Sequence, residues 1–220
     1  MQRGFGLDIP ETLDDLCVRE RLALIVYDMQ VGIVQQLPDG EAVIERVAAV
    51  LDAARSGGIR VFFTRHMSLP NETAGVAQLR TAMAWQRKAH VADVSPSFPR
   101  DSAQFQIVPA LAPRPNEAVF DKITMSAFVG TPLDIALRDC GLISFAIVGV
   151  ALEVGIEPTV RHATDLAYIP IVVTDACGSR DKDAARRSLS AITFAGGSLL
   201  VDSAALIPRM RGAPPTGAVT

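Results

Sequence analysis

The sequence predicts a single α/β domain built on a doubly wound, six-stranded parallel sheet with helices on both faces, a three-layer arrangement. Two observations lead to this prediction. Continuous apolar runs of strand length alternate along the chain with segments whose apolar residues recur at helical spacing. The length of 220 residues suits one α/β domain, and the chain contains no internal repeat. Such alternation requires right-handed crossovers, which place helices on both sides of the sheet.

The amino-terminal half contains three of the predicted strands. The run Leu22–Tyr27 (LALIVY) is apolar throughout, as in a strand that is buried on both faces, and it ends at Asp28. The next strands are 60–64 (RVFFT) and 118–120, the second of which precedes Asp121 and Lys122. Between the first two strands a helix is predicted, because one helical face gathers Val43, Val47, Val50, Leu51 and Ala54 before Gly57 and Gly58 end it.

The carboxyl-terminal half continues the alternation with three more strands. The predicted strands are 145–150 (FAIVGV), 169–174 (IPIVVT) and 198–201. The predicted helices are 132–139, 156–166 and 183–194, the last of which ends at Gly196 and Gly197.

Three segments lie outside this pattern. Residues 1–20 are predicted to form a leader with one short helix, the domain proper spans 21–207, and 208–220 are predicted to be a flexible tail. Segment 67–117, about fifty residues with little regular pattern, is too long for a plain connection. We therefore expect it to serve the function or a subunit contact.

Composition excludes several classes of protein. Hydrophobic residues make up 49% of the chain and charged residues 20%, close to the average of soluble globular proteins. A net charge of -3, without a run of five or six like charges, argues against a nucleic-acid partner. The longest apolar run, 143–152, is interrupted by Ser144 and is too short to cross a membrane. We therefore expect neither nucleic acid nor membrane as a partner.

Cysteine usage and the amino terminus predict a cytoplasmic protein. Cys17, Cys140 and Cys177 are widely spaced, odd in number and unaccompanied by zinc-ligand spacing, which fits a reducing compartment. The first residues lack the apolar stretch of a secretory signal. Neither GxGxxG nor a P-loop occurs, so no cofactor is expected.

Candidate site residues follow three predicted strands. Ligands in an open doubly wound sheet bind beyond the carboxyl ends of the strands, near the switch in strand order. Asp28, Lys122 and the turn from Val150 to Gly155 all lie at such ends, so we expect them to share one pocket. The backbone N–H groups of Val150, Ala151 and Gly155 stand at a helix start, where they could bind an anion or an oxyanion. The alternative is an ordinary strand-to-helix turn.

The chain resembles a known family at several of these positions. The matching pieces are Asp28-Met29-Gln30 after a buried strand, Phe120-Asp121-Lys122, Gly149-Val150 followed by a short turn into a helix, and the strand that ends at Asp175-Ala176. Together they resemble the isochorismatase-like hydrolases, also called the cysteine hydrolase superfamily, over residues 21 to 201. The resemblance implies a six-stranded parallel sheet of the Rossmann type and a homo-oligomer that assembles through helices and segment 67–117.

The resemblance also implies an Asp, Lys, Cys triad for hydrolysing amides. Asp28 would be the acid/base and Lys122 its cationic neighbour, but Gly155 stands where the cysteine would fall. Cys177 is the nearest substitute by topology, although a core role suits it better. We expect Gly155 to leave room for a bulkier substrate.

Some family members are described as cleaving a vinyl ether without the cysteine. The resemblance therefore implies non-covalent hydrolysis of a small carboxylate-bearing molecule, with Asp28 delivering the proton and Lys122 binding a substrate carboxylate. Two alternatives stay open: an amidase in which Asp28 or Glu153 activates water, and a non-catalytic protein that binds small anions.

Other side chains are predicted around this pocket. Glu153 could hold a water in place of the thiol, or could be structural, and Glu157 could do the same or simply favour a helix start. The predicted substrate-binding residues are Gln30, His66, Trp85 and Arg87, the last because a guanidinium matches a carboxylate. The Asp-x-His arrangement of metal-binding nicotinamidases is absent after the second strand, so no metal is expected.

Overall fold

The computed structural model describes residues 1–212, and residues 213–220 of the predicted tail lie outside the described part. Its main sheet has six parallel strands in the order β5-β4-β3-β6-β7-β8. These strands are β3 (Leu22–Tyr27), β4 (Arg60–His66), β5 (Ala118–Lys122), β6 (Ser144–Val150), β7 (Ile169–Gly178) and β8 (Leu199–Val201). The predicted six-stranded, doubly wound sheet is confirmed.

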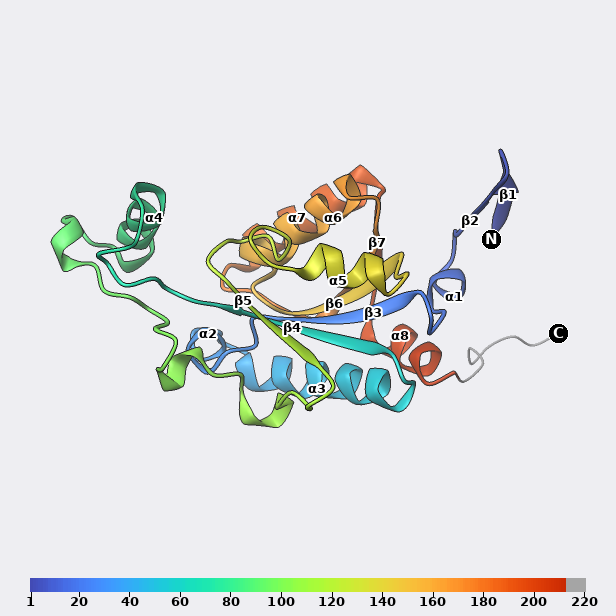
Figure 1. Cartoon of the computed structure of the whole chain (residues 1–220), viewed down its shortest axis with the longest axis horizontal. Coiled ribbons are helices and arrows are strands. Elements are labelled where there is room, and N and C mark those ends of the chain that lie inside the picture. Colours follow the sequence, from blue (N-terminus) through green and yellow to red (C-terminus); the bar gives the residue numbers. More distant parts are fainter. Residues whose placement is uncertain (213–220) are drawn as a thin grey trace.

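Helices cover both faces of the sheet (Figure 1). One face carries α3 (Gly40–Ser56) and α8 (Ser203–Met210), with the short α2 (Val31–Val34) at its edge. The other face carries α5 (Leu133–Asp139), α6 (Glu157–Asp165) and α7 (Lys182–Ala195). Each face packs its own cluster of hydrophobic side chains, and β3 and β6, which are buried at every residue, lie between the two clusters. The central strands therefore hold the residues at their carboxyl ends in fixed positions.

Three elements differ from the prediction. Helix α4 (Val76–Gln86) lies inside the segment predicted to be irregular, and it projects from the domain with no buried residue (Figure 1). Its residues are half-buried or exposed and form no continuous apolar stripe, which is why the periodicity did not reveal it. The leader holds the expected short helix α1 (Leu13–Leu16) but also a hairpin of β1 (Gln2–Gly4) and β2 (Leu7–Ile9). Helix α8 reaches Met210 and so enters the range predicted as tail.

Three strands run further than predicted, and their extensions carry polar residues. Strand β4 continues to His66, β5 includes Lys122 as its last residue, and β7 continues to Gly178, so that Cys177 lies on a strand. The strand order turns back at β3, whose neighbours are β4 and β6. Asp28, at the end of β3, therefore stands at the switch point where an open α/β sheet forms its crevice.

Gly149 allows the last residues of β3 and β6 to approach closely. Its φ is +123°, and a Cβ at this position would lie 2.0 Å from the carbonyl oxygen of Tyr27. Gly130 also has a positive φ, +74°, but a Cβ there would meet nothing within 4 Å.

We expect Gly149→Ala to lower the free energy of unfolding by more than about 3 kcal/mol, because both backbone and contact become strained. Gly130→Ala is the matched control and should cost only about 1–2 kcal/mol, the penalty for the left-handed backbone alone. Urea unfolding measures both values. Equal losses in the two variants would contradict the close approach of the strands.

Candidate active site

A buried ion pair joins the ends of β3 and β5. The Lys122 ammonium lies 2.6 Å from Oδ2 of Asp28, and the two side chains are 0% and 5% exposed. The Thr64 hydroxyl donates to the other carboxylate oxygen, Oδ1, at 2.6 Å. Both oxygens of Asp28 therefore hold a donor, and the carboxylate has one orientation relative to the cavity described below.

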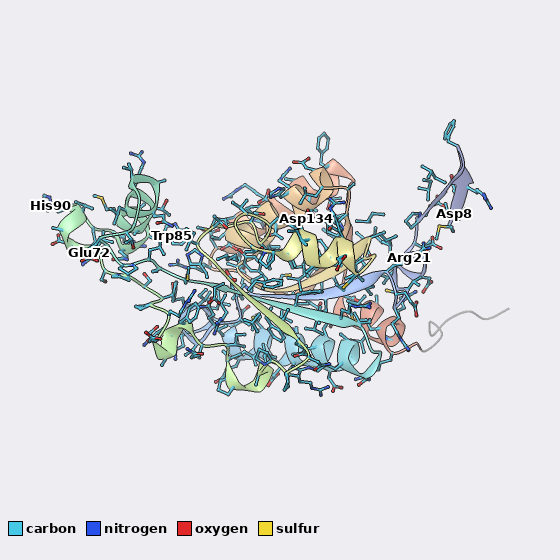
Figure 2. The ribbon with its side chains drawn as sticks, viewed as in Figure 1. Asp8, Arg21, Glu72, Trp85, His90 and Asp134 are labelled. Atoms are coloured by element: carbon cyan, nitrogen blue, oxygen red, sulfur yellow. The ribbon has the colours of Figure 1, made fainter. Side chains whose placement is uncertain are left out.

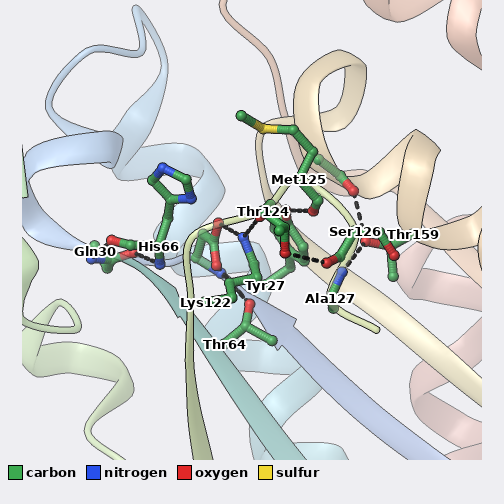
Figure 3. A network of polar contacts seen from close by, with 12 residues as sticks. Tyr27, Gln30, Thr64, His66, Lys122, Thr124, Met125, Ser126, Ala127 and Thr159 are labelled. Carbon is green, nitrogen blue, oxygen red and sulfur yellow. Dashed lines mark hydrogen bonds and ion pairs between the residues drawn. The ribbon is translucent and has the colours of Figure 1, made fainter. Parts of the chain in front are cut away.

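Protein groups surround the ammonium of Lys122. Its ammonium also donates to the carbonyl oxygen of Thr124 at 3.1 Å and lies 4.3 Å from the centre of the Tyr27 ring (Figure 3). Burial lowers the pKa of Lys122, and the carboxylate of Asp28 opposes this effect. The proton between Lys122 and Asp28 is thus held less firmly than on a free lysine.

A cavity of about 200 Å³ opens beside Asp28. Its wall includes residues from the ends of β3, β4, β6 and β7 and from the α4 arm: Tyr27, Asp28, His66, Trp85, Phe98, Val150, Ala151, Val154, Gly155 and Arg180. A second cavity of about 370 Å³ adjoins it beneath α4 and shares His66, Trp85 and Phe98, but Asp28 is not part of its wall. We therefore assign the smaller cavity to the chemistry.

Tyr27 occupies the space over Gly155. A Cβ on residue 155 would lie 2.1 Å from the Tyr27 hydroxyl oxygen and 2.5 Å from the ring carbon that bears it. The expectation that Gly155 leaves room for a bulkier substrate is therefore wrong, because the phenol of a neighbouring strand fills that room. A side chain at 155, a thiol included, has no place while Tyr27 is present.

The Tyr27 phenol is fixed as a hydrogen-bond donor. Its hydroxyl donates to the carbonyl oxygen of Met125, in the loop that follows β5 (Figure 3). The same loop is tied to α6, because the amide of Ala127 donates to the Thr159 hydroxyl, which in turn donates to the carbonyl of Gly155. Burial raises the pKa of Tyr27, so the phenol stays protonated at neutral pH.

The glycine turn differs from the predicted anion site. Gly155 lies in a π-helical turn (Leu152–Ile156), and its N–H already donates to the carbonyl oxygen of Ala151 at 3.0 Å. Val150, Ala151 and Gly155 all line the cavity. The Gly155 N–H was predicted to bind an anion, but it already donates its hydrogen bond within the turn.

Glu153 and Glu157 both bind protein groups, but Oε2 of Glu153 is buried without a hydrogen-bond partner in the described residues, so a water at Glu153 stays a prediction. Oε1 of Glu153 accepts the backbone N–H groups of Arg180 and Asp181, at 2.9 and 3.1 Å, and Glu153 does not line the cavity. Glu157 pairs with Arg161 at 3.0 Å and accepts from the Ser188 hydroxyl.

The four predicted substrate-binding residues divide into two pairs. His66 and Trp85 line the cavity, and Figure 2 shows Trp85 between α4 and the sheet. Burial, helped by the charge of Lys122, lowers the pKa of His66, so its imidazole is neutral at pH 7. Gln30 is fully buried and instead bridges the backbones of His66 and Phe105. Arg87 is exposed at the left-handed end of α4 and lines neither cavity.

Three site residues were missed by the sequence reasoning. Thr64 ends the predicted second strand, and a polar residue at that place was a usable signal. Tyr27 is the one aromatic residue in an otherwise aliphatic strand run, directly before Asp28. Arg180 lies in the turn after β7, where nothing in the local sequence distinguishes it from the neighbouring charged residues.

Other chemistry has little support in the described residues. Cys177 is held near the carbonyl oxygen of Ile147, and burial raises its pKa, so it is a poor nucleophile. Among residues 1–212 no group of three or more histidine, cysteine or acidic side chains is placed to hold a metal ion. Within the same residues no helix is both long and apolar enough to cross a bilayer.

Solved structures share this arrangement of strands and helices. A cysteine hydrolase from Pseudomonas syringae pv. phaseolicola superimposes with a TM-score of 0.77 at 23% identity, over 90% of this chain and 95% of that one. An isochorismatase family protein from Burkholderia thailandensis gives 0.71 at 28% identity, over 88% and 97%. The fold is therefore that of the isochorismatase-like hydrolases, a class of α/β enzymes.

The Isochorismatase domain matches residues 22–204, and the chain belongs to that family. It is 30% identical over 139 residues to the ureidoacrylate amidohydrolase RutB of Methylorubrum extorquens, covering 61% of this chain and 56% of the relative. It is 27% identical over 199 residues to enterobactin synthase component B of Escherichia coli, covering 88% and 66%. The chain thus spans between one half and two thirds of the length of these relatives. RutB is named as an amidohydrolase, and the solved structure from Pseudomonas syringae as a cysteine hydrolase.

We expect Gly155→Ala to destabilise the protein by about 1–3 kcal/mol, because its methyl group overlaps the buried Tyr27 phenol. Shortening Tyr27 should relieve this overlap. In a double-mutant cycle with Tyr27→Val, the double variant should therefore lose less stability than the sum of the two single losses, by about 1 kcal/mol or more. Urea unfolding of the four proteins gives the coupling. Additive losses would show that Tyr27 does not occupy the space over residue 155.

Proposed function

We propose that the protein hydrolyses a small carboxylate-bearing molecule of the vinyl ether type without a covalent enzyme intermediate. Asp28 acts as the general acid and base in this proposal. The supporting observation is the combination of a filled nucleophile position, where Tyr27 covers Gly155, with a buried Asp28–Lys122 pair beside a cavity. Asp28 and Lys122 can transfer a proton at this place, whereas no side chain at residue 155 can act as a nucleophile.

A covalent route would require an activated nucleophile. The Tyr27 phenol is protonated and donates its hydrogen to Met125, and the Cys177 thiol is buried with a raised pKa. Water is therefore the nucleophile in the proposed reaction.

The proposed reaction runs through protonation of the substrate, addition of water and breakdown of a hemiketal. Asp28 protonates the terminal vinyl carbon, and the positive charge that develops is shared between the adjacent carbon and the ether oxygen. A water molecule adds to that carbon and returns its proton to Asp28. The resulting hemiketal breaks into a ketone and an alcohol, so one water is consumed for each bond cleaved.

Lys122 is the proposed source of the proton that Asp28 delivers. The two groups are 2.6 Å apart, and burial lowers the pKa of Lys122. A carboxylate with a cation beside it is normally a base, but transfer of the lysine proton makes Asp28 an acid and leaves a neutral pair. This resolves the conflict between the ion pair and an acid role for Asp28.

One relative supports a different reaction type. RutB is named as an amidohydrolase that acts on ureidoacrylate, and this favours the alternative of an amidase in which Asp28 activates water. A non-catalytic protein that binds small anions is the third alternative. Isochorismate, nicotinamide and an N-carbamoyl amino acid, each tested as a substrate, separate these proposals.

We further propose that the protein is cytoplasmic and forms a homo-oligomer. Helix α4 supports assembly, because it has no buried residue and presents Val76 and Trp85, which are 88% and 47% exposed. Size-exclusion chromatography with light scattering measures the number of subunits.

Wild-type protein should cleave isochorismate, and Asp28→Asn should lower kcat by about 10²- to 10⁴-fold, the usual contribution of general acid–base catalysis. Steady-state kinetics measures this loss. Asp139→Asn, which removes an exposed carboxylate on α5, is the matched control and should keep full activity.

Folding must be separated from catalysis in this experiment. Asp28→Asn leaves Lys122 buried without its charge partner, at a cost of about 3–5 kcal/mol. The double variant Asp28→Asn/Lys122→Met removes both charges and should recover most of that stability without recovering activity. Full turnover in Asp28→Asn would exclude the assigned role, and silence on all three substrates despite measurable ligand binding would favour the anion-binding protein.

A thiol reagent should modify the protein without inhibiting it. Cys140 is exposed, whereas burial raises the pKa of Cys17 to about 11 and that of Cys177 still further. Mass spectrometry after treatment with N-ethylmaleimide at neutral pH should show one added group, which Cys140→Ser removes. Loss of activity in the treated Cys140→Ser protein would point to Cys177 as a nucleophile.

A further inference from the structure

We propose that Arg180 is the residue that binds the anionic group of the substrate, with Glu153 as its positioning residue. This inference rests on the proposed function, because it names how that site selects its substrate. Lys122 was the expected carboxylate ligand, but its ammonium is buried against Asp28, Thr124 and the Tyr27 ring and is absent from the cavity wall.

Arg180 is the one lysine or arginine on the wall of the Asp28 cavity, within the described residues 1–212. Its exposed guanidinium has no ion-pair partner in that part of the chain, as is true of several other arginines, but Arg180 alone among them lies on the cavity wall. His66, the other basic residue on the wall, is neutral at pH 7. An anion that enters this cavity therefore meets one positive side chain.

The carboxylate of Glu153 fixes the turn that carries Arg180. Oε1 of Glu153 accepts the N–H groups of both Arg180 and Asp181, and Asp181 in turn caps α7 by accepting the amide of Ala184 at 2.7 Å. Glu153 does not line the cavity, so its carboxylate acts on the ligand only through the backbone of this turn.

The sheet sets the spacing between the anchor and the reacting bond. Asp28 follows β3 and Arg180 follows β7, and β6 lies between them. Two strand spacings amount to about 10 Å between the chain positions. The Asp28 carboxylate repels an anion beside it, whereas Arg180 attracts one on the far side of β6. A substrate with its carboxylate at one end and its labile bond at the other fits this arrangement.

A binding experiment tests this proposal without relying on turnover. Trp85 is the single tryptophan of the chain and lines the same cavity, so its fluorescence reports binding. Benzoate and benzamide form a matched pair of probes, because they share a shape and differ in charge. Wild-type protein should bind benzoate about tenfold or more tightly than benzamide, as expected for a charge-assisted bidentate contact.

The variants separate charge, position and chemistry. Arg180→Gln should abolish the preference for benzoate, and Arg180→Lys should retain part of it, since lysine lacks the planar fork. Arg187→Gln is the matched control, because it removes an exposed charge from α7, a helix whose residues do not line the cavity. Glu153→Ala should weaken the preference, and Glu153→Gln, which keeps an acceptor oxygen for both amides, should restore it.

Two results would overturn the assignment: a wild-type protein that binds benzoate no better than benzamide, or not at all, and an Arg180→Gln protein that keeps the full preference. Failure of the proposed function is distinguishable from either, since it would leave the benzoate preference intact and only turnover missing.

Discussion

The buried pair of Asp28 and Lys122 is the interaction around which this site is organised. Two opposite charges inside a protein are tolerated only when each is fully engaged, because neither can turn to water. Thr64, Thr124 and the Tyr27 ring complete that engagement, and they come from the ends of adjacent strands. The pair therefore fixes the loop after β5 against the end of β3 and gives the Asp28 carboxylate a single orientation beside the cavity.

Tyr27 and Gly155 determine which chemistry this pair can serve. The phenol occupies the volume that a side chain at 155 would need, and its own hydroxyl is committed to Met125. We therefore propose that the site transfers protons and uses no thiol at residue 155. The two residues are complementary in size, so neither can be understood alone. A large aromatic at 27 requires the smallest residue at 155.

Charge is distributed across the cavity rather than concentrated at the ion pair. Lys122, which does not line the cavity, neutralises Asp28. Arg180 follows β7, which is two strands away from β3 in the sheet. Glu153, which the sequence suggested as a catalytic group, contributes by holding the backbone of the Arg180 turn. Oε1 of Glu153 thus has a structural role, and in our proposal the guanidinium of Arg180 binds the ligand.

The sequence by itself determined the layered α/β fold, the six strands of the main sheet and the placement of Asp28 and Lys122 at one edge. These features depend on local periodicity and on the rule that parallel strands end at the same edge. Helix α4 escaped prediction because it has no buried face. Only the tertiary structure decided that Tyr27 fills the space over Gly155, that Gln30 and Glu153 bind backbone groups, and that Arg180 rather than Arg87 reaches the cavity. The physical reason is that each of these outcomes depends on contacts between segments distant in sequence, for which neither composition nor spacing carries a signal.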